Sequence, residues 1–344
     1  MVPHKSSARA PALIYAGVDE AGYGPLIGPL CVAACVLRVS GFEPGDPSPD
    51  LWRALRRVVR REPGSRSTKW IAVNDSKRLK LANSLRRTHP LTHLERGVLA
   101  FAHRLDRIAC ADDASLLAGL GASLADRAWY RTEPTALPLT TTPDHLRLLS
   151  SRLAGAMEGA GVELLDMRCP TVCEETFNRR LRDSGTKARV SFDVAGTLVR
   201  RVWLSEAAGE SEEPARVVID RQGGRTSYAP ELARVLPGVS VDVVAESARA
   251  SVYEVRGEVG GRERRMRVIF EVEAEGRHFP VALASMTAKL VRELAMMRIN
   301  RYWSGRLAEL KPTAGYRNDA HRWLEDARRM GAPEDELRLL CRDA

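Results

Sequence analysis

The sequence predicts an α/β fold in which helices flank a mixed β-sheet. In the first part of the chain, short apolar runs that suit strands alternate with amphipathic stretches that suit helices. After residue 215, short runs of alternating apolar and polar residues follow one another closely, which is typical of hairpins. A chain of 344 residues is long enough to bury one large core or two modest ones.

The N-terminal part of the chain predicts two strands and a basic helix. Residues 1–11 are rich in Pro, Ser and basic residues and predict a disordered tail. Residues 12–20 and 29–39 are apolar and predict strands joined by a corner rich in glycine and proline. After a loop, residues 52–61 carry arginines and no acid, with apolar residues at helical spacing. The basic face of this expected helix could contact phosphates or simply be solvated.

The middle of the chain predicts a helical insertion at about residues 104–160. Its expected helices span residues 105–110, 114–129 and 146–157, and a strand at 162–167 follows. The insertion could hold a substrate or a partner, or it could decorate the fold.

The remaining elements complete the sheet and add an appendage. We expect a helical region at 176–203, strands at 215–220, 238–245, 249–256 and 267–272, and helices in 303–342. An arginine cluster at residues 262–267 precedes the last strand and is expected along an outer edge. The domain organisation predicted is one main α/β domain at 12–300, which includes the insertion, followed by a C-terminal helical appendage at 301–344.

Composition favours a polyanionic partner and a reduced cytoplasmic setting. Lys and Arg number 53 against 44 Asp and Glu, which gives a formal net charge of +9. Basic residues can also be enriched for other reasons, so the charge is only consistent with nucleic-acid binding. The six cysteines form no Cys-x-x-Cys pair, and the start of the chain does not read as a signal peptide. The longest apolar run is too short and too interrupted to span a membrane.

Residues 17–30 are the most informative segment. Asp19 and Glu20 are adjacent, so a strand would place them on opposite faces. Both can serve one site only where the strand ends, and we expect Gly22 and Gly24 to supply the turn. Carboxylates beside an open glycine backbone suggest metal-assisted chemistry on a phosphate ester. The alternative is a strand–turn–strand corner with two solvated acids.

This segment resembles the first motif of the type 2 ribonucleases H, the ribonuclease HII-like family, which reads Asp-Glu-Ala-Gly-Arg-Gly-Pro-Leu-Ala-Gly-Pro. Residues 74–79 resemble the family's Asp-Ser-Lys-Lys-Leu, and residues 217–220 resemble the apolar strand that ends in the third catalytic Asp. Residues 284–293 resemble the helix Ala-Ser-Ile-x-Ala-Lys-x-x-Arg-Asp, and residues 315–321 weakly match Lys-Gly-Tyr-x-Thr-x-x-His. The motifs occur in the family's order.

The resemblance implies a ribonuclease H-like fold and a metal-dependent endonuclease. Such an enzyme hydrolyses the RNA strand of RNA–DNA hybrids, 5′ of ribonucleotides, and leaves 3′-hydroxyl and 5′-phosphate ends. Two Mg²⁺ or Mn²⁺ ions are expected as cofactors, and the partner is a hybrid or a ribonucleotide-containing duplex bound by a monomer. Competing functions are a non-catalytic module that binds hybrid or structured nucleic acid, and a related nuclease that acts on DNA.

The resemblance also implies the site residues. The catalytic and metal-binding acids are Asp19, Glu20, Asp220 and a fourth acid ten residues before Ser285, which is Glu275; Glu273 is the alternative. The expected substrate-binding residues are Gly22, Tyr23, Gly24, Lys77, Ser285, Lys289 and Tyr316.

Three positions depart from the family pattern, and one of them is Glu293, which stands where the family's last motif ends in Asp. Tyr23 stands where the family has Arg, which predicts retained but blunted selection of ribonucleotides. Arg221 stands where the family has Gly and would place a bulky cation beside the acids.

Overall fold

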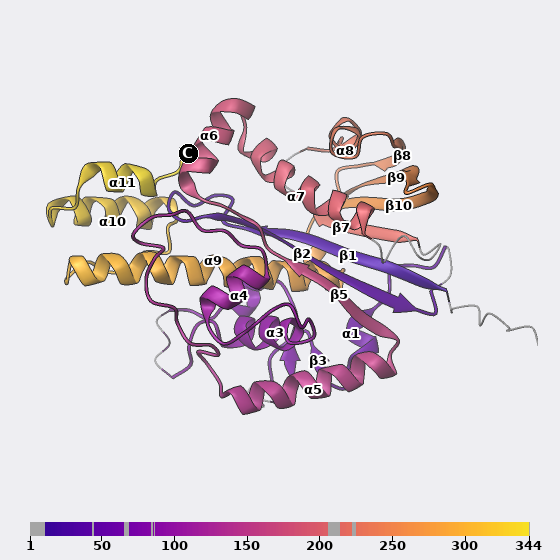
Figure 1. The fold of residues 1–344 in the computed structure, drawn as a ribbon, viewed down its shortest axis with the longest axis horizontal. Helices are drawn as coiled ribbons and strands as arrows, with labels where there is room; N and C mark the ends of the chain where they lie inside the picture. Colours follow the sequence, from indigo (N-terminus) through magenta and orange to yellow (C-terminus); the bar gives the residue numbers. More distant parts are fainter. Residues whose placement is uncertain are drawn as a thin grey trace, which may run out of the picture.

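The computed structural model describes residues 11–42, 45–64, 69–83, 85, 87–205, 214–221 and 225–343. Within them, one eight-stranded mixed sheet is covered by helices, which confirms the predicted α/β class (Figure 1). The tail predicted at residues 1–11 lies outside the described residues, except for Pro11.

The centre of the sheet places two acidic strand ends side by side. Strand β1 (Ala12–Ala21) pairs with β2 (Leu30–Ser40) in antiparallel orientation and with β7 (Ala215–Asp220) in parallel orientation. In the parallel pair, Val18 lies opposite Ile219. The carboxyl ends of β1 and β7 therefore meet at the same edge of the sheet. This register brings the first motif and the third expected catalytic acid together.

The other strands extend the sheet on both sides. The order is β5-β2-β1-β7-β10-β9-β8, and β6 also pairs with β2. The bounds are β5 Val162–Arg168, β6 Thr171–Val172, β8 Ser240–Glu246, β9 Ala250–Val259 and β10 Arg262–Glu271. A separate parallel pair joins β3 (Val59–Arg60) to β4 (Ile71–Ala72). The arginine cluster at 262–267 belongs to β10, between β7 and β9, so the expectation that it follows an outer edge is wrong.

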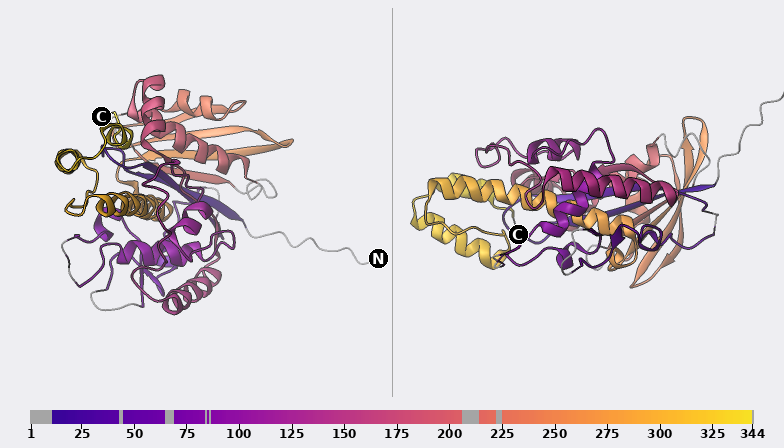
Figure 2. Two further views of the ribbon diagram at one scale, coloured as in Figure 1. Left: turned by 60° about the vertical axis from the view of Figure 1, so that its left-hand side comes forward. Right: turned by 90° about the horizontal axis from the view of Figure 1, so that it is seen from below.

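Helices cover both faces of the sheet (Figures 1 and 2). Helix α9 (Phe279–Arg306) packs across β1 and β2 on one face. Gly17 permits this close contact, because a Cβ there would lie 2.1 Å from Val281 N. The helices around α9 are α3 (Thr92–Ala102) and α5 (Pro143–Gly159), and those on the other face are α6 (Glu174–Ser184), α7 (Lys187–Leu204) and α8 (Ala229–Val235).

Side chains alternate along β1 between two buried cores. Leu13 and Tyr15 belong to the core beneath α9, and Ile14 and Ala16 belong to the core beneath α7. This alternation is the period of a strand that is buried on both faces. The strand is therefore rigidly held, and so is the position of the acids at its end.

Two expected helices are shorter than the sequence predicts. Of residues 52–61, only the start is helical, in α1 (Leu51–Ala54), because the chain then turns so that the buried Val59 can pair with Ile71. In the insertion, α4 (Asp113–Gly119) ends well before residue 129, and Gly121 just after it has a φ of +73°. No helix forms at 105–110. The pairing of Val59 with Ile71 and the left-handed φ of Gly121 thus prevent the longer helices that the local sequence pattern predicts.

The C-terminal helices are continuous with the core. Helix α9 runs to Arg306, so the predicted boundary at residue 300 falls inside a helix. It is followed by α10 (Arg317–Arg329) and α11 (Glu334–Leu340). Trp303 and Trp323 pack edge to face between α9 and α10, with ring centroids 5.7 Å apart. Among the described residues, none of the helices combines the length and the apolar character needed to cross a bilayer.

Candidate active site

Asp19 is a buried acid near the end of β1. It is 7% exposed, and it accepts a hydrogen bond from the Glu20 N–H at 2.7 Å. Burial, reinforced by the charges of Glu20 and Asp220, raises the pKa of Asp19 well above its ordinary value, although the nearby Ser285 side chain opposes this rise. Asp19 therefore lies among like charges, and the Glu20 N–H orients its carboxylate.

Asp220 ends β7 and faces the same group of acids. Its carboxylate accepts a hydrogen bond from the Ala274 N–H at 3.0 Å. Burial raises the pKa of Asp220 to about 7; the Ala274 N–H opposes this effect, whereas the charges of Glu275 and Glu20 add to it. Asp220 thus interacts with acids from both β1 and the short 3₁₀ helix η2 (Ala274–Gly276).

Of the two candidates for the fourth acid, Glu275 is the one beside Asp220. Glu273 precedes η2 with a φ of +54°, and its charge is not among those that chiefly shift the pKa of Asp220. The Glu275 carboxylate has one buried oxygen, Oε2, without a hydrogen-bond partner. A buried carboxylate oxygen without a donor is costly, so this atom is available to a cation.

The four acids are neighbours, but their carboxylates are not arranged to coordinate one metal ion together. Nowhere in the described part of the chain are three or more His, Cys, Asp or Glu side chains disposed to hold a metal ion. Their donors are nevertheless hard carboxylate oxygens, which suit Mg²⁺ and Mn²⁺. Burial and then like charges raise the pKa of Asp19 and of Asp220, and a cation among the acids would relieve the repulsion between them.

The second motif lies next to these acids. Asp75 caps helix α2 (Ser76–Leu79) by accepting a hydrogen bond from the Lys77 N–H at 2.9 Å. Burial lowers the pKa of Lys77, but the charges of Asp75, Glu275, Asp19 and Asp220 outweigh it and raise the pKa overall. The Lys77 ammonium group is therefore within electrostatic reach of the acid cluster.

Ser285 joins the second motif to the fourth. Its hydroxyl donates to the Ser76 hydroxyl oxygen at 3.0 Å, and it accepts from the Ser76 N–H at 3.5 Å. Ser285 is 4% exposed, so it orients neighbouring groups from within the core.

The two glycines of the first motif differ in what they require. Gly22 has a φ of +89°, and a Cβ there would lie 2.6 Å from the Pro29 carbonyl oxygen. Gly24 has no positive φ, and its Cβ would meet nothing within 4 Å. Both glycines lie in or beside the bend, but only Gly22 has a conformation that requires glycine.

Tyr23 lies between these glycines and is partly buried. Burial and the Glu20 charge raise the pKa of the Tyr23 phenol, whereas the charge of Arg225 lowers it. The phenol is thus close to one acid of the cluster and to an arginine that sequence reasoning missed.

Lys289 and Tyr316 lie together beside the loop that joins β1 to β2. The Lys289 Nζ atom is 2.7 Å from a carboxylate oxygen of Glu293 and 5.9 Å from the centre of the Tyr316 ring. Tyr316 is 50% exposed at the start of α10, and the preceding Gly315 carbonyl accepts hydrogen bonds from Leu26 and Ile27. The weak fifth motif is therefore bonded to the first.

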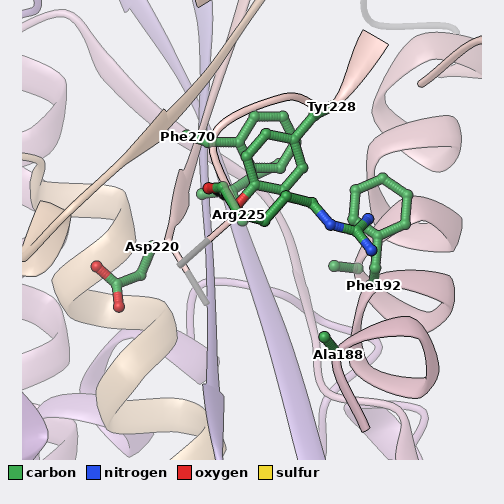
Figure 3. A pocket seen from close by; sticks show the side chains of 8 residues that line it. Ala188, Phe192, Asp220, Arg225, Tyr228 and Phe270 are labelled. Atoms are coloured by element: carbon green, nitrogen blue, oxygen red, sulfur yellow. Dashed lines mark hydrogen bonds between the residues drawn. The ribbon is translucent and has the colours of Figure 1, made fainter. Parts of the chain in front are cut away.

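A small pocket of about 20 Å³ borders Asp220 and has room for about one water molecule (Figure 3). Tyr228 stacks on Phe270 in it, with ring centroids 3.7 Å apart, and the Asp220 carboxylate points away from these rings. Arg225 borders the pocket and bonds Glu231 at 2.8 Å. No motif marks Arg225 or Tyr228, because both follow β7 in a loop whose pattern carries no signal.

Arg221 is directed at a hairpin instead of at the acids. Its buried guanidinium donates to the carbonyls of Ser247 at 2.9 Å and Ala248 at 2.6 Å. The expectation of a bulky cation crowding the acids is therefore wrong, because these bonds fix the guanidinium between β8 and β9.

Comparisons with known proteins give structural likenesses only. No family model and no curated protein matches the chain. A chain of the PCNA–RNase HII complex from Archaeoglobus fulgidus aligns over 96% of this chain and 93% of its own length, with 15% identity and a TM-score of 0.42. Ribonuclease H2 from Pyrococcus horikoshii aligns over 92% and 88%, with 16% identity and a TM-score of 0.39.

A third likeness is to Bst-RNase HIII in complex with Mn²⁺, over 96% of this chain and 66% of that one, with 15% identity and a TM-score of 0.39. These three structures carry the names ribonuclease HII, ribonuclease H2 and ribonuclease HIII. Identities and TM-scores this low carry no conclusion about activity.

Proposed function

We propose that this protein is a divalent-metal-dependent endonuclease that hydrolyses the RNA strand of RNA–DNA hybrids. The observation that carries the proposal is that acids from three separate segments lie close enough for their charges to act on Asp19 and Asp220. These acids are Asp19 and Glu20 from β1, Asp220 from β7 and Glu275 from η2. A partly buried cluster of like charges destabilises a fold, so its presence at a sheet edge favours a functional role.

These four residues would hold the metal ions. Bound Mg²⁺ or Mn²⁺ would supply an activated water and stabilise the leaving oxygen. Carboxylate oxygens are the donors that these ions prefer. The Oε2 atom of Glu275, which has no hydrogen-bond partner, could coordinate one of them. The Asp220 carboxyl, with a pKa of about 7, would ionise fully once a cation offset its neighbours.

The chain's own groups would orient this chemistry. The Glu20 N–H bonds Asp19, and the Ala274 N–H bonds Asp220, so two of the acids are held in fixed directions. The Lys77 ammonium would attract a substrate phosphate toward the acids, and its charge would offset theirs in the absence of substrate.

Selection of RNA would occur at the first-motif loop. The 2′-hydroxyl is what distinguishes RNA from DNA at a single position. The backbone at Gly22 and Gly24 could approach it closely, Tyr23 could pack on a sugar, and the exposed Tyr316 could stack nearby. Cleavage 5′ of ribonucleotides, with 3′-hydroxyl and 5′-phosphate ends, comes from the motif resemblance.

The test is cleavage of three labelled duplexes: an RNA–DNA hybrid, a DNA duplex with one ribonucleotide, and an all-DNA duplex. Each is incubated with Mg²⁺, with Mn²⁺, or with a chelator. We expect the hybrid to be cut only with metal, into products that a DNA polymerase can extend from their 3′-hydroxyls. Binding of the hybrid without cutting would favour the non-catalytic module, and equal cutting of all-DNA duplex would favour the DNA nuclease.

A further inference from the structure

The last residues of the described chain bond the loop that follows the acids of β1. The Arg342 N–H donates to the Leu26 carbonyl at 2.8 Å, and the Arg342 Nε–H donates to the Pro25 carbonyl at 2.9 Å. Ile27 and Cys341 form an antiparallel β-bridge. Residues 341–343, here called the C-terminal clamp, therefore pair with loop residues 25–27 although the two segments are far apart in sequence.

Arg342 is a buried arginine. It is 3% exposed, and the centre of its guanidinium lies 4.5 Å from the centre of the Phe177 ring. Burial of a guanidinium is costly unless its donors and its charge are compensated. The Pro25 carbonyl accepts from it, the Phe177 ring lies against it, and the buried Glu174 carboxylate is close enough for each charge to act on the other's pKa. Its Nη1 atom is buried without a hydrogen-bond partner among the described residues, so the compensation is partial. The interaction is specific and fixed in direction.

The clamp is itself held by α6. The Asn178 side-chain amide donates to the Cys341 carbonyl at 2.9 Å, and its carbonyl oxygen accepts from the Asp343 N–H at 2.6 Å. Asn178 thus bonds the backbone on both sides of Arg342. This reciprocal pairing fixes the clamp to a long helix, so the loop is bonded to a rigid element through it.

A second buried arginine, Arg292 of α9, holds the other half of the loop. Its guanidinium donates to the Pro29 carbonyl at 3.0 Å and to the Ile27 carbonyl at 3.0 Å. The carbonyls of residues 25, 26, 27 and 29 therefore all have arginine or clamp donors. By contrast, Gly24 at the tip of the loop has open space around it. The loop has a fixed base and an accessible tip next to the acids.

We infer that Arg342 is a positioning residue that holds the base of the loop so that residues 22–24 face the substrate. This inference rests on the proposed function, because it assigns the loop tip to substrate binding. Arg342 lies behind the loop and would touch neither substrate nor metal. Its loss should therefore weaken substrate binding while leaving the chemical step on bound substrate nearly unchanged.

The test compares Arg342→Gln with wild type and with Arg338→Gln, a control on α11. Arg338 is 80% exposed, and its ion pair to Glu334 is 3.7 Å long. Hydrogen exchange of a peptide covering residues 22–29 measures loop order without substrate, and steady-state kinetics on the hybrid separate KM from kcat. We expect loop exchange and KM each to rise about tenfold in Arg342→Gln, with kcat within about twofold of wild type.

A conservative variant adds a graded result. Arg342→Lys keeps the charge and one donor toward Pro25, so its loop exchange and KM should fall between those of wild type and Arg342→Gln. Should Arg342→Gln fail to fold, Asn178→Ala removes the other end of the clamp and should loosen the same loop peptide while the core strands keep their protection.

Three results would overturn the inference: unchanged loop exchange in Arg342→Gln, an equal change in Arg338→Gln, or a fall in kcat without a rise in KM. The exchange measurement needs no substrate. Failure of wild type to cleave any duplex would therefore overturn the proposed function, whereas unchanged exchange would overturn the clamp.

Discussion

The Asp220 carboxylate accepts a hydrogen bond from the Ala274 N–H at 3.0 Å. This bond connects the end of β7 to the short helix η2 and so brings Glu275 against Asp220. Because Asp220 also interacts with Glu20 of β1, it is the acid that links the two sides of the cluster. Its charge state should therefore govern both the stability of the fold and the proposed activity.

Asp220→Asn should stabilise the metal-free protein at alkaline pH. The pKa of Asp220 is raised to about 7 in the fold, above the value of about 4 in an unfolded chain, so stability is lost as pH rises through that range. The variant lacks this loss. Its free energy of unfolding, measured with urea and a chelator, should exceed that of wild type by on the order of 2 kcal/mol at pH 8 and by less at pH 5.

The control for this experiment is Asp144→Asn, an exposed acid at the start of α5. It should change stability little and equally at both pH values. A loss of stability in Asp220→Asn at pH 8 would contradict the account of a repelling acid cluster.

Glu275→Gln and Glu273→Gln should behave differently. Glu275 contributes to the raised pKa of Asp220, so its neutralisation should lower that pKa, and it should also reduce cleavage by about a hundredfold or more if it holds metal. Glu273→Gln should leave the pKa of Asp220 and the cleavage rate nearly as in wild type. Carboxyl NMR titration of Asp220 reports the pKa, and the reverse ranking of the two variants would assign the fourth acid to Glu273.

Much of this site could be predicted from sequence, because motif residues at strand ends must meet where parallel strands end. This reasoning predicts that Asp19, Glu20 and Asp220 lie near one another. Strand β7 begins and ends at the predicted residues. Glu275 could not be separated from Glu273, since that depends on the left-handed φ of Glu273 and on one bond from Ala274. Long-range contacts carry no local signal, so Arg225 and the bonds of Arg221 and Arg342 were not foreseen.

Alanine substitutions at the two motif glycines should have unequal effects. At Gly22, a Cβ would meet the Pro29 carbonyl oxygen at 2.6 Å with φ at +89°, so Gly22→Ala must distort the loop. At Gly24, the space is open. We expect Gly22→Ala to weaken hybrid binding at least tenfold and Gly24→Ala by less than about threefold, as measured by fluorescence anisotropy. Equal effects would mean that side-chain space at the tip, and not loop shape, limits binding.

Tyr23→Arg should shift substrate preference. Tyr23 keeps the loop but lacks the charge that an arginine would offer a phosphate, so wild type should cut a run of ribonucleotides more readily than a single one. The variant should raise the rate on the single-ribonucleotide duplex relative to the hybrid. The ratio of the two rates is the readout, with an all-DNA duplex as control, and an unchanged ratio would remove Tyr23 from substrate selection.

The central claim is that the acid cluster performs metal-dependent hydrolysis. The most direct test is the cleavage rate of Asp220→Asn on an RNA–DNA hybrid with Mn²⁺. Asp144→Asn is the control, and hybrid binding is measured in parallel. The account predicts a loss of about a thousandfold or more in Asp220→Asn, with binding within about threefold of wild type and Asp144→Asn fully active. Cleavage by Asp220→Asn at near the wild-type rate would contradict it.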